Sequence, residues 1–154
     1  MGRKGIDGVL LTHLKIISHP KGDIMHGIKR SDQGFVEFGE AYFTIVKFGE
    51  IKGWNKHKRM TLNLCVPVGK VFFVLYDDRE KSKTRGNFLP VEISVDDYQR
   101  LTVPPDVWLA FMGMGDDAIN LILNVADMEH DPDEIERLDP FDPSIPYEWN
   151  IKNQ

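Results

Sequence analysis

A basic segment at residues 52–59 combines residue types that can bind an anion and move a proton. It contains no acidic residue and four cations: Lys52, Lys56, Lys58 and Arg59. Because the segment interrupts an apolar, strand-like region, we interpret it as facing a bound anion and not as a solvated loop. His57 lies within it, and histidine, with an ordinary pKa of about 6.5, suits the role of a general base near neutral pH.

Two polar residues follow the basic segment in an alternating pattern. Thr61 and Asn63 alternate with Leu62 and Leu64, so the two polar side chains share one face of a strand. Polar groups that point into a barrel need partners, which can be either a ligand or structural hydrogen bonds. We expect Thr61 and Asn63 to face the barrel interior and name them as candidate substrate contacts.

The elements that would position these residues are short strands. Seven segments mix apolar, aromatic and β-branched residues and predict strands: 10–17, 41–48, 60–66, 71–76, 89–95, 100–103 and 118–125. Turn sequences separate them at 19–23, 67–69, 81–87 and 104–106. Many short strands with frequent turns indicate a sandwich or barrel, a class that includes jelly rolls and cupins.

The last third of the chain adds two features to this pattern. Residues 131–138 begin with acidic residues and a proline, and they predict a helical turn. Residues 139–149 contain three prolines and aromatic anchors, and they predict an ordered, extended strap. We find no linker or repeat and expect a single domain over residues 1–154.

Composition excludes several classes of function. The net charge of -5 argues against a general nucleic-acid binder, although the charge is uneven: residues 116–148 hold eleven acidic residues and one basic residue, Arg137. No apolar stretch approaches the roughly 20 residues needed to span a bilayer, so no membrane segment is expected. Cys65 is the only cysteine, which excludes a disulfide within the chain and fits a reducing, cytoplasmic setting.

Five sequence blocks occur in an order that is typical of one protein family. Asp77-Asp78-Arg79 with Ser82, Thr84 and Gly86 is similar to D-x-R-x-x-S-x-T-x-G. Residues 94–111 are similar to S-x-E-N…L-x-I-P-x-G-x-A-H-G-F, and residues 130–149 to Y-x-P…L-D-P…I-x-W. Residues 52–54 stand at an R-G-L motif, and residues 22–26 at an early G-x-F-x-E strand. In these blocks the chain resembles the dTDP-4-dehydrorhamnose 3,5-epimerase family of cupins.

The resemblance implies a fold and a reaction. The fold is an all-β cupin, a double-stranded β-helix (jelly-roll) barrel, with a short helical turn and an extended C-terminal strap. The reaction is proton abstraction next to the ketone of a nucleotide-diphospho-4-keto-6-deoxy sugar, followed by return of a proton to the opposite face of the ring.

The position of the base departs from the family pattern. The family's base histidine directly follows R-G-L, but this chain has Asn55 there, and an amide cannot take a proton from carbon. His57 lies two residues later, on the same face of a regular strand. The segment Asn55-Lys56-His57-Lys58 also resembles the H-x-H-K arrangement of the sugar-nucleotide 3,4-ketoisomerases. We expect His57 to be the base and Asn55 to contact substrate. The alternative for His57 is a structural histidine at the strand edge that hydrogen-bonds to the backbone.

The resemblance assigns further roles by position. His130 stands where the epimerases place their acid tyrosine, and the alternative is an ordinary turn residue. Asp139 stands where the family's aspartate orients the base, or is a plain turn aspartate. Lys52 stands at the arginine that binds phosphate, and Lys58 is a candidate to stabilise an enolate; as free surface lysines they would do neither. Leu109 replaces the family's second pocket histidine.

Metal and cofactor chemistry are not expected. The usual cupin metal site has two histidines one residue apart, then a carboxylate and a third histidine, and Asn55 and Leu109 interrupt that set. No cofactor is required, because the ketone itself acidifies the neighbouring C–H bond.

Together these features predict a sugar-nucleotide epimerase, acting at one or two carbons, in deoxysugar or cell-surface polysaccharide biosynthesis. A 3,4-ketoisomerase is the alternative that the Asn-Lys-His-Lys segment favours. A non-catalytic sugar-nucleotide-binding cupin is the alternative that Asn55 and Leu109 favour. The resemblance also implies a homodimer in which an early strand crosses to the neighbouring barrel, since exposed sheet edges favour pairing.

Overall fold

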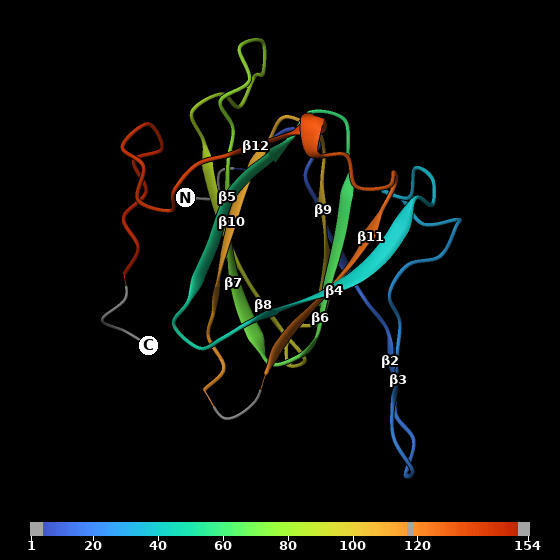
Figure 1. Cartoon of the computed structure of the whole chain (residues 1–154). Coiled ribbons are helices and arrows are strands. Elements are labelled where there is room, and N and C mark those ends of the chain that lie inside the picture. The colour runs from blue at the N-terminus through green and yellow to red at the C-terminus, as the bar shows by residue number, and fades with distance from the viewer. Residues whose placement is uncertain (1–4, 117–118, 151–154) are drawn as a thin grey trace.

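Two five-stranded antiparallel sheets form the body of the molecule (Figure 1). The computed structural model describes residues 5–116 and 119–150. The first sheet has the order β1 (Leu10–His13), β9 (Gln99–Val103), β6 (Leu62–Val68), β11 (Asn120–Ala126) and β4 (Glu40–Val46). The second has the order β12 (Ile135–Arg137), β5 (Ile51–His57), β10 (Trp108–Gly113), β7 (Lys70–Tyr76) and β8 (Phe88–Ser94). The predicted all-β barrel is confirmed.

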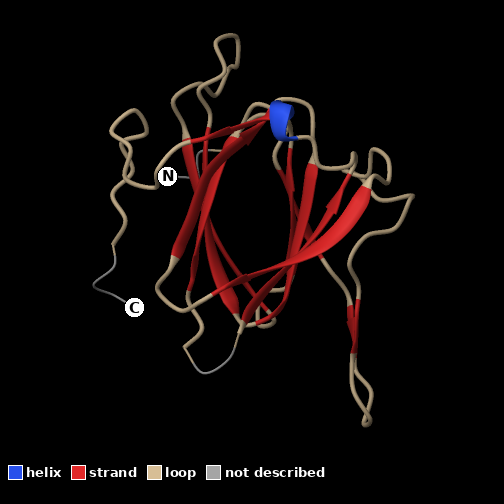
Figure 2. Cartoon of the chain, in the orientation of Figure 1, coloured by secondary structure: helices blue, strands red, loops and turns tan. Residues whose placement is uncertain are grey.

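Two smaller elements accompany the sheets. A two-stranded ribbon of β2 (Ile16–Ile17) and β3 (Ile24–Met25) projects away from the barrel. A short 3-10 helix, η1 (Pro132–Glu134), lies at one end of the barrel, and Figure 2 shows it as the one helical turn among the strands of the described chain. Among the residues that the structure describes, no helix has the length and hydrophobicity required to cross a membrane.

The main core lies between the two sheets, because strands of each sheet direct apolar side chains toward the other. Phe73 and Leu75 of β7, Leu101 of β9 and Ile122 of β11 are buried in one cluster. Val74 is also fully buried, but it belongs to a second cluster on the opposite face of β7. The continuous apolar run 71–76 is therefore a strand buried on both faces, as its sequence predicts.

The second core cluster lies beneath the C-terminal strap, residues 139–149. Ile145 and Trp149 of the strap are buried against Trp54 of β5 and Trp108 of β10. The indole nitrogens of Trp54 and Trp149 both donate to the carbonyl of Pro140, at 3.2 Å each. The prediction of an extended tail with aromatic anchors is confirmed, and its function is to cover the outer face of the second sheet.

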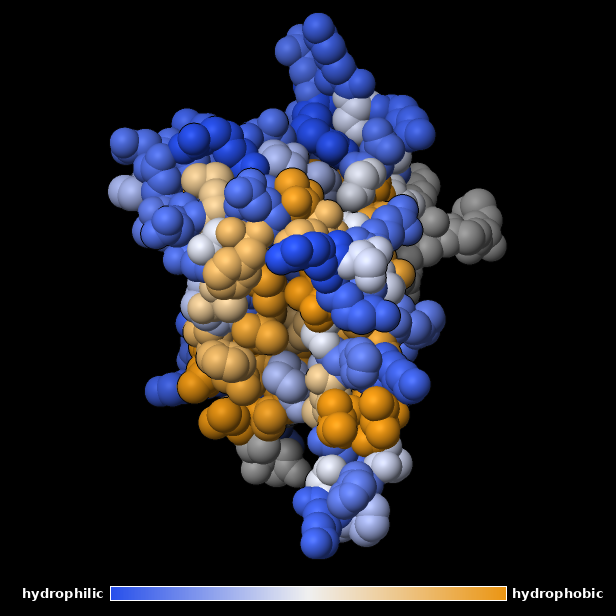
Figure 3. Space-filling view, turned by 90° about the vertical axis from the view of Figure 1, so that its right-hand side faces the viewer, coloured by the Kyte–Doolittle hydropathy of each residue, from blue (hydrophilic) through white to orange (hydrophobic). Residues whose placement is uncertain are grey.

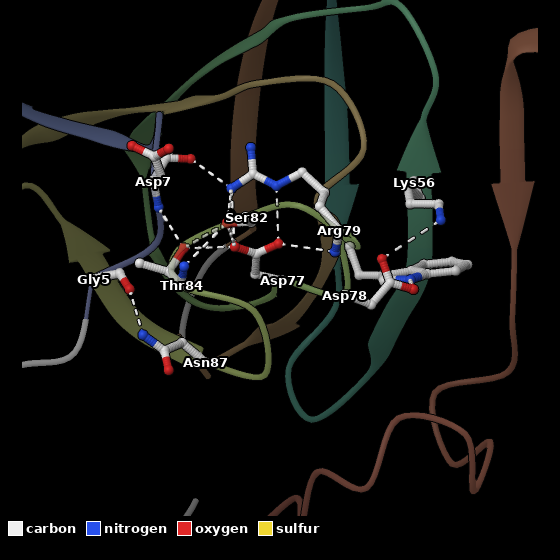
Figure 4. A network of polar contacts seen from close by, with 10 residues as sticks. Gly5, Asp7, Lys56, Asp77, Asp78, Arg79, Ser82, Thr84 and Asn87 are labelled. Atoms are coloured by element: carbon white, nitrogen blue, oxygen red, sulfur yellow. Dashed lines mark hydrogen bonds and ion pairs between the residues drawn. The ribbon is translucent and has the colours of Figure 1, made fainter.

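The sequence block Asp77-Asp78-Arg79 with Ser82 and Thr84 builds a hydrogen-bonded turn. The buried carboxylate of Asp77 accepts hydrogen bonds from Arg79 Nε at 2.9 Å, Ser82 Oγ at 2.6 Å and Thr84 Oγ1 at 2.6 Å (Figure 4). Burial alone would raise the pKa of Asp77, but these bonds outweigh it and hold that pKa well below its ordinary value. Arg79 Nη2 also donates to the carbonyl of Asp7 at 2.7 Å, which ties the N-terminal segment to this turn.

Three element predictions need correction. Residues 10–17 form two separate strands, because the chain turns from the barrel into the ribbon between β1 and β2. Residues 131–138 are not one helical turn: after η1, residues 135–137 pair with β5 as an edge strand. Strand β10 was not predicted, because Trp108 and its neighbours follow a proline-rich turn without a clear alternation. In the predicted strand 118–125, Ala118 lies outside the described residues.

Candidate active site

Two adjoining cavities lie between the sheets and share three lining residues, Tyr42, Asn55 and His57. The inner cavity, about 160 Å³, has further polar lining from Thr44, Lys52 and Asn124 and apolar lining from Leu62, Leu64, Leu109, Phe111 and Ile122. The outer cavity, about 420 Å³, is completed by Glu40, His130, Ile135 and Arg137. An apolar pocket with a few convergent polar groups is typical of a small-molecule site.

A bulge in β5 brings the polar residues of the basic segment to one face. Asn55 pairs with Leu109 of β10 and Lys52 pairs with Phe111, so three steps along β5 correspond to two steps along β10. Lys52, Asn55 and His57 therefore all line the inner cavity. A regular strand would place Lys52 and Asn55 on opposite faces.

His57 is held by a buried carboxylate from a neighbouring element. Ile135 of β12 pairs with His57, which places the preceding residue, Glu134, beside the imidazole. Nδ1 of His57 donates to Oε1 of Glu134. The other oxygen, Oε2, accepts from the backbone N–H groups of Arg59 and Met60, at 3.2 Å each. The carboxylate thus has partners on both oxygens although its side chain is fully buried.

These contacts fix the charge of Glu134. Burial alone would raise the pKa of this carboxyl, but the hydrogen bonds from His57 and the backbone of Arg59 and Met60 outweigh burial and lower it. An ionised carboxylate can only accept, so the hydrogen of neutral His57 is assigned to Nδ1. Nε2 is then the nitrogen with the free lone pair, which is the arrangement that a general base requires.

A lysine, Lys52, is among the residues that line the inner cavity. Nζ of Lys52 donates to the carbonyl of Ile45 at 2.9 Å, which holds its ammonium group near β4. Leu109, at the position of the family's second pocket histidine, adds apolar surface to the same cavity. Lys52, Asn55 and His57 thus line the same cavity, and their roles as substrate contacts and base stay predictions.

The remaining predicted catalytic residues lie farther out. His130 is exposed, and it lines the outer cavity but not the inner one. Asp139 is exposed in a turn where its Oδ1 accepts from the N–H of Phe141 at 2.9 Å, so the carboxylate that contacts His57 is Glu134 and not Asp139. The side chain of Lys58 is exposed and lines neither cavity, because the strand ends at His57 and the chain bends there.

The expectation for Thr61 and Asn63 is wrong, because strand β6 presents the opposite face. Leu62 and Leu64 line the inner cavity. Asn63 Oδ1 accepts from Thr102 Oγ1 at 2.6 Å and its Nδ2 donates to the carbonyl of Gly34 at 3.0 Å. The polar groups of Asn63 therefore have structural partners, which was the alternative to a ligand contact. The side chain of Thr61 lines neither cavity.

Three residues of the site were not predicted from the sequence. An alternating pattern could have identified two of them, whereas no pattern marks the third. Tyr42 and Thr44 alternate with Phe43 and Ile45 in a predicted strand, so their shared face was readable from the sequence. Glu134 had no such signal, because it is one of many acidic residues in its region. In the part of the chain that the structure describes, no group of three or more His, Cys, Asp and Glu side chains is arranged to hold a metal ion.

Comparison with known proteins relates the chain to one family. The family model for dTDP-4-dehydrorhamnose 3,5-epimerase matches residues 4–154. A probable low-salt glycan biosynthesis epimerase from Haloferax volcanii is 32% identical over 154 residues, covering 96% of each chain. A spore coat polysaccharide biosynthesis protein from Bacillus subtilis is 29% identical over 150 residues, covering 96% of this chain and 98% of the relative.

A solved structure agrees in fold as well as in sequence. A dTDP sugar isomerase from Desulfovibrio desulfuricans superposes with a TM-score of 0.90 at 37% identity, covering 94% of this chain and 92% of that one. The matches extend over nearly the whole chain. The chain therefore belongs to the dTDP-4-dehydrorhamnose 3,5-epimerase family, whose members are isomerases of sugar nucleotides.

Proposed function

We propose that this protein epimerises a nucleotide-diphospho-4-keto-6-deoxy sugar, with His57 as the base. The observation that carries the proposal is the buried Glu134 carboxylate, which contacts His57 at the junction of two cavities. Nε2 of His57 removes the proton from a carbon next to the ketone, and Glu134 stabilises the imidazolium that forms. The Glu134–His57 pair stands in for the family pair in which the histidine would be at position 55 and the aspartate at position 139.

Asn55 complements this base. Its side chain lines both cavities beside His57, and an amide N–H can donate to the ketone oxygen as that oxygen becomes negative. We assign this role to Asn55 in place of Lys58, which lies outside both cavities. Lys52 supplies the cation that contacts the diphosphate of the substrate.

The substrate class and the pathway rest on the relatives. A relative at 37% identity is a dTDP sugar isomerase, and two others act in glycan and spore coat polysaccharide biosynthesis. We infer a nucleotide-sugar substrate and a place in polysaccharide biosynthesis. The unbroken family match supports one domain over residues 1–154, and the single free thiol, Cys65, fits the cytoplasm.

We further propose a homodimer formed through the outer face of the first sheet. Phe43 and Ile45 of β4 are exposed there, at 65% and 49%, and Phe38 precedes the strand at 63%. Figure 3 shows an apolar area on this side of the molecule. A solvent-facing sheet surface is ordinarily polar, and an apolar patch beside an edge strand marks a protein interface.

Solvent deuterium incorporation tests the proposed reaction. Wild-type protein is incubated in D₂O with 4-keto-6-deoxy sugars carried by dTDP, CDP, GDP and UDP, and the products are analysed by NMR and mass spectrometry. An epimerase introduces deuterium beside the ketone with inversion, whereas a 3,4-ketoisomerase moves the ketone. Binding without deuterium incorporation for every substrate would make the protein a non-catalytic sugar-nucleotide binder.

A further inference from the structure

Tyr42 faces the same two cavities as His57 but comes from the other sheet. It lies on β4, the edge strand of the first sheet, whereas His57 lies on β5 of the second. Both side chains line the inner and the outer cavity. A sugar ring that occupies the junction of the cavities would therefore meet the imidazole from one sheet and the phenol from the other. Inversion at carbon needs this arrangement, since the proton leaves one face and arrives at the other.

The hydrogen bonds around Tyr42 orient its hydroxyl as a donor. Asn124 Nδ2 donates to Tyr42 Oη at 3.1 Å, and Asn124 Oδ1 accepts from the backbone N–H of Asn63 at 3.1 Å. Because a backbone N–H can only donate, it fixes which end of the Asn124 amide is oxygen. Tyr42 Oη thus accepts from Asn124, and among the described residues it has no acceptor for its own hydrogen. That hydrogen is available to a ligand in the cavity.

We propose that Tyr42 is the catalytic acid that protonates the enolate on the face opposite His57; this inference rests on the proposed function. His57 Nε2 takes the proton as the C–H electrons form the enolate. The O–H bond of Tyr42 then breaks, its proton joins the same carbon, and the enolate electrons form the new C–H bond while the ketone is restored. The step leaves an imidazolium and a tyrosinate, so the net charge is unchanged, and proton exchange through solvent resets both groups.

The surroundings of Tyr42 suit this role better than those of His130, which the sequence alone favoured. The Asn124 N–H remains as a donor to the tyrosinate oxygen once the proton has left. His130 is exposed and does not line the inner cavity. An acid must reach the same carbon that His57 serves, and only Tyr42 of these two shares both cavities with His57.

Separating exchange from inversion tests the proposal. Tyr42→Phe, His130→Phe and wild type are compared in D₂O with dTDP-4-keto-6-deoxyglucose, and with the CDP, GDP and UDP counterparts where wild type does not act on it. Tyr42→Phe should lower the rate of inversion by ~10²–10⁴-fold. Deuterium should still enter the same carbon with retention, because His57 alone can remove a proton and return a deuteron. Tyr147→Phe is the matched control, since it removes a phenol hydroxyl of the strap that packs in the aromatic cluster and lines neither cavity, and its rates should equal those of wild type.

Three outcomes of this experiment would contradict the proposal in different ways. Inversion by Tyr42→Phe at the wild-type rate would overturn the assignment, and loss of inversion in His130→Phe alone would give the role to His130. A wild type that exchanges none of these substrates would instead overturn the proposed function, and this inference with it. Thermal melting of each variant confirms that the compared proteins are folded.

Discussion

Glu134 and His57, 77 positions apart in the sequence, form a histidine–carboxylate pair at the cavity between the two sheets. The pairing of β12 with β5 brings them together, since Ile135 lies opposite His57. Backbone N–H groups of Arg59 and Met60 hold the second oxygen of Glu134 in place. The carboxylate therefore fixes both the orientation and the tautomer of the imidazole.

Replacing Glu134 with glutamine should lower kcat much more than it changes KM. The amide removes the negative charge that stabilises the imidazolium, which forms only as the proton is transferred, and we expect a loss of ~10²–10⁴-fold. Steady-state kinetics with the substrate found by deuterium incorporation measures the split. Glu136→Gln is the matched control, because Glu136 pairs with Lys56 at 3.1 Å and lies outside both cavities. Equal losses in the two variants would mean that Glu134 supports only the fold.

Replacing Lys52 with alanine should weaken binding of the nucleotide sugar. A charge-assisted contact to phosphate contributes about 1.5–3 kcal/mol, and Lys52 is the lysine that lines the inner cavity. Isothermal titration calorimetry gives the affinity, and Lys58→Ala should leave it unchanged because that side chain lines neither cavity. A Lys58→Ala variant that binds as weakly as Lys52→Ala would point to a diffuse basic surface instead of a specific contact.

Replacing Phe43 with lysine should convert the proposed dimer to a monomer. Phe43 is exposed at 65% on the apolar face of β4, where a charge would have to be buried in the interface. Light scattering at micromolar concentration measures the mass. Phe141→Lys, a change at an equally exposed phenylalanine of the strap, should remain dimeric. Wild-type protein that is monomeric in this measurement would contradict the shared interface.

The stabilising effect of Asp77 should disappear in acid. Its pKa is lowered in the folded state, so its contribution to the free energy of unfolding is complete above the unfolded-state pKa of about 3.9 and declines as the pH falls further. Asp77→Asn should therefore be less stable than wild type at pH 7, and this difference should shrink between about pH 4 and pH 2. Urea unfolding across this range measures it, and a constant difference would mean that the charge of Asp77 contributes no stability.

Most of the fold could be predicted from the sequence, because strand periodicity and the order of the motifs are visible in local sequence patterns. The run 71–76 and the strap 139–149 are positioned as predicted. The face of β6 was assigned wrongly, since alternation shows that Thr61 and Asn63 share a face but not which face points inward. The apolar residues of that strand took the interior position.

The candidate site could be predicted only in part from the sequence, because it depends on pairing between segments that are distant in the chain. Lys52 reaches the cavity through a bulge that is visible only in the pairing of β5 with β10. Glu134 reaches His57 only because residues 135–137 add an edge strand where the sequence predicted a helical turn. Positional resemblance alone pointed to Asp139, which is held in a local turn.

The central claim is that His57 is the base, and deuterium incorporation by His57→Asn tests it most directly. Asparagine keeps a polar side chain in the cavity but cannot accept a proton from carbon. We predict that this variant binds the nucleotide sugar with an affinity close to that of wild type and loses deuterium incorporation beside the ketone, because a base acts on the transition state and not on the bound ground state. Deuterium incorporation by His57→Asn at the wild-type rate would show that another group takes the proton.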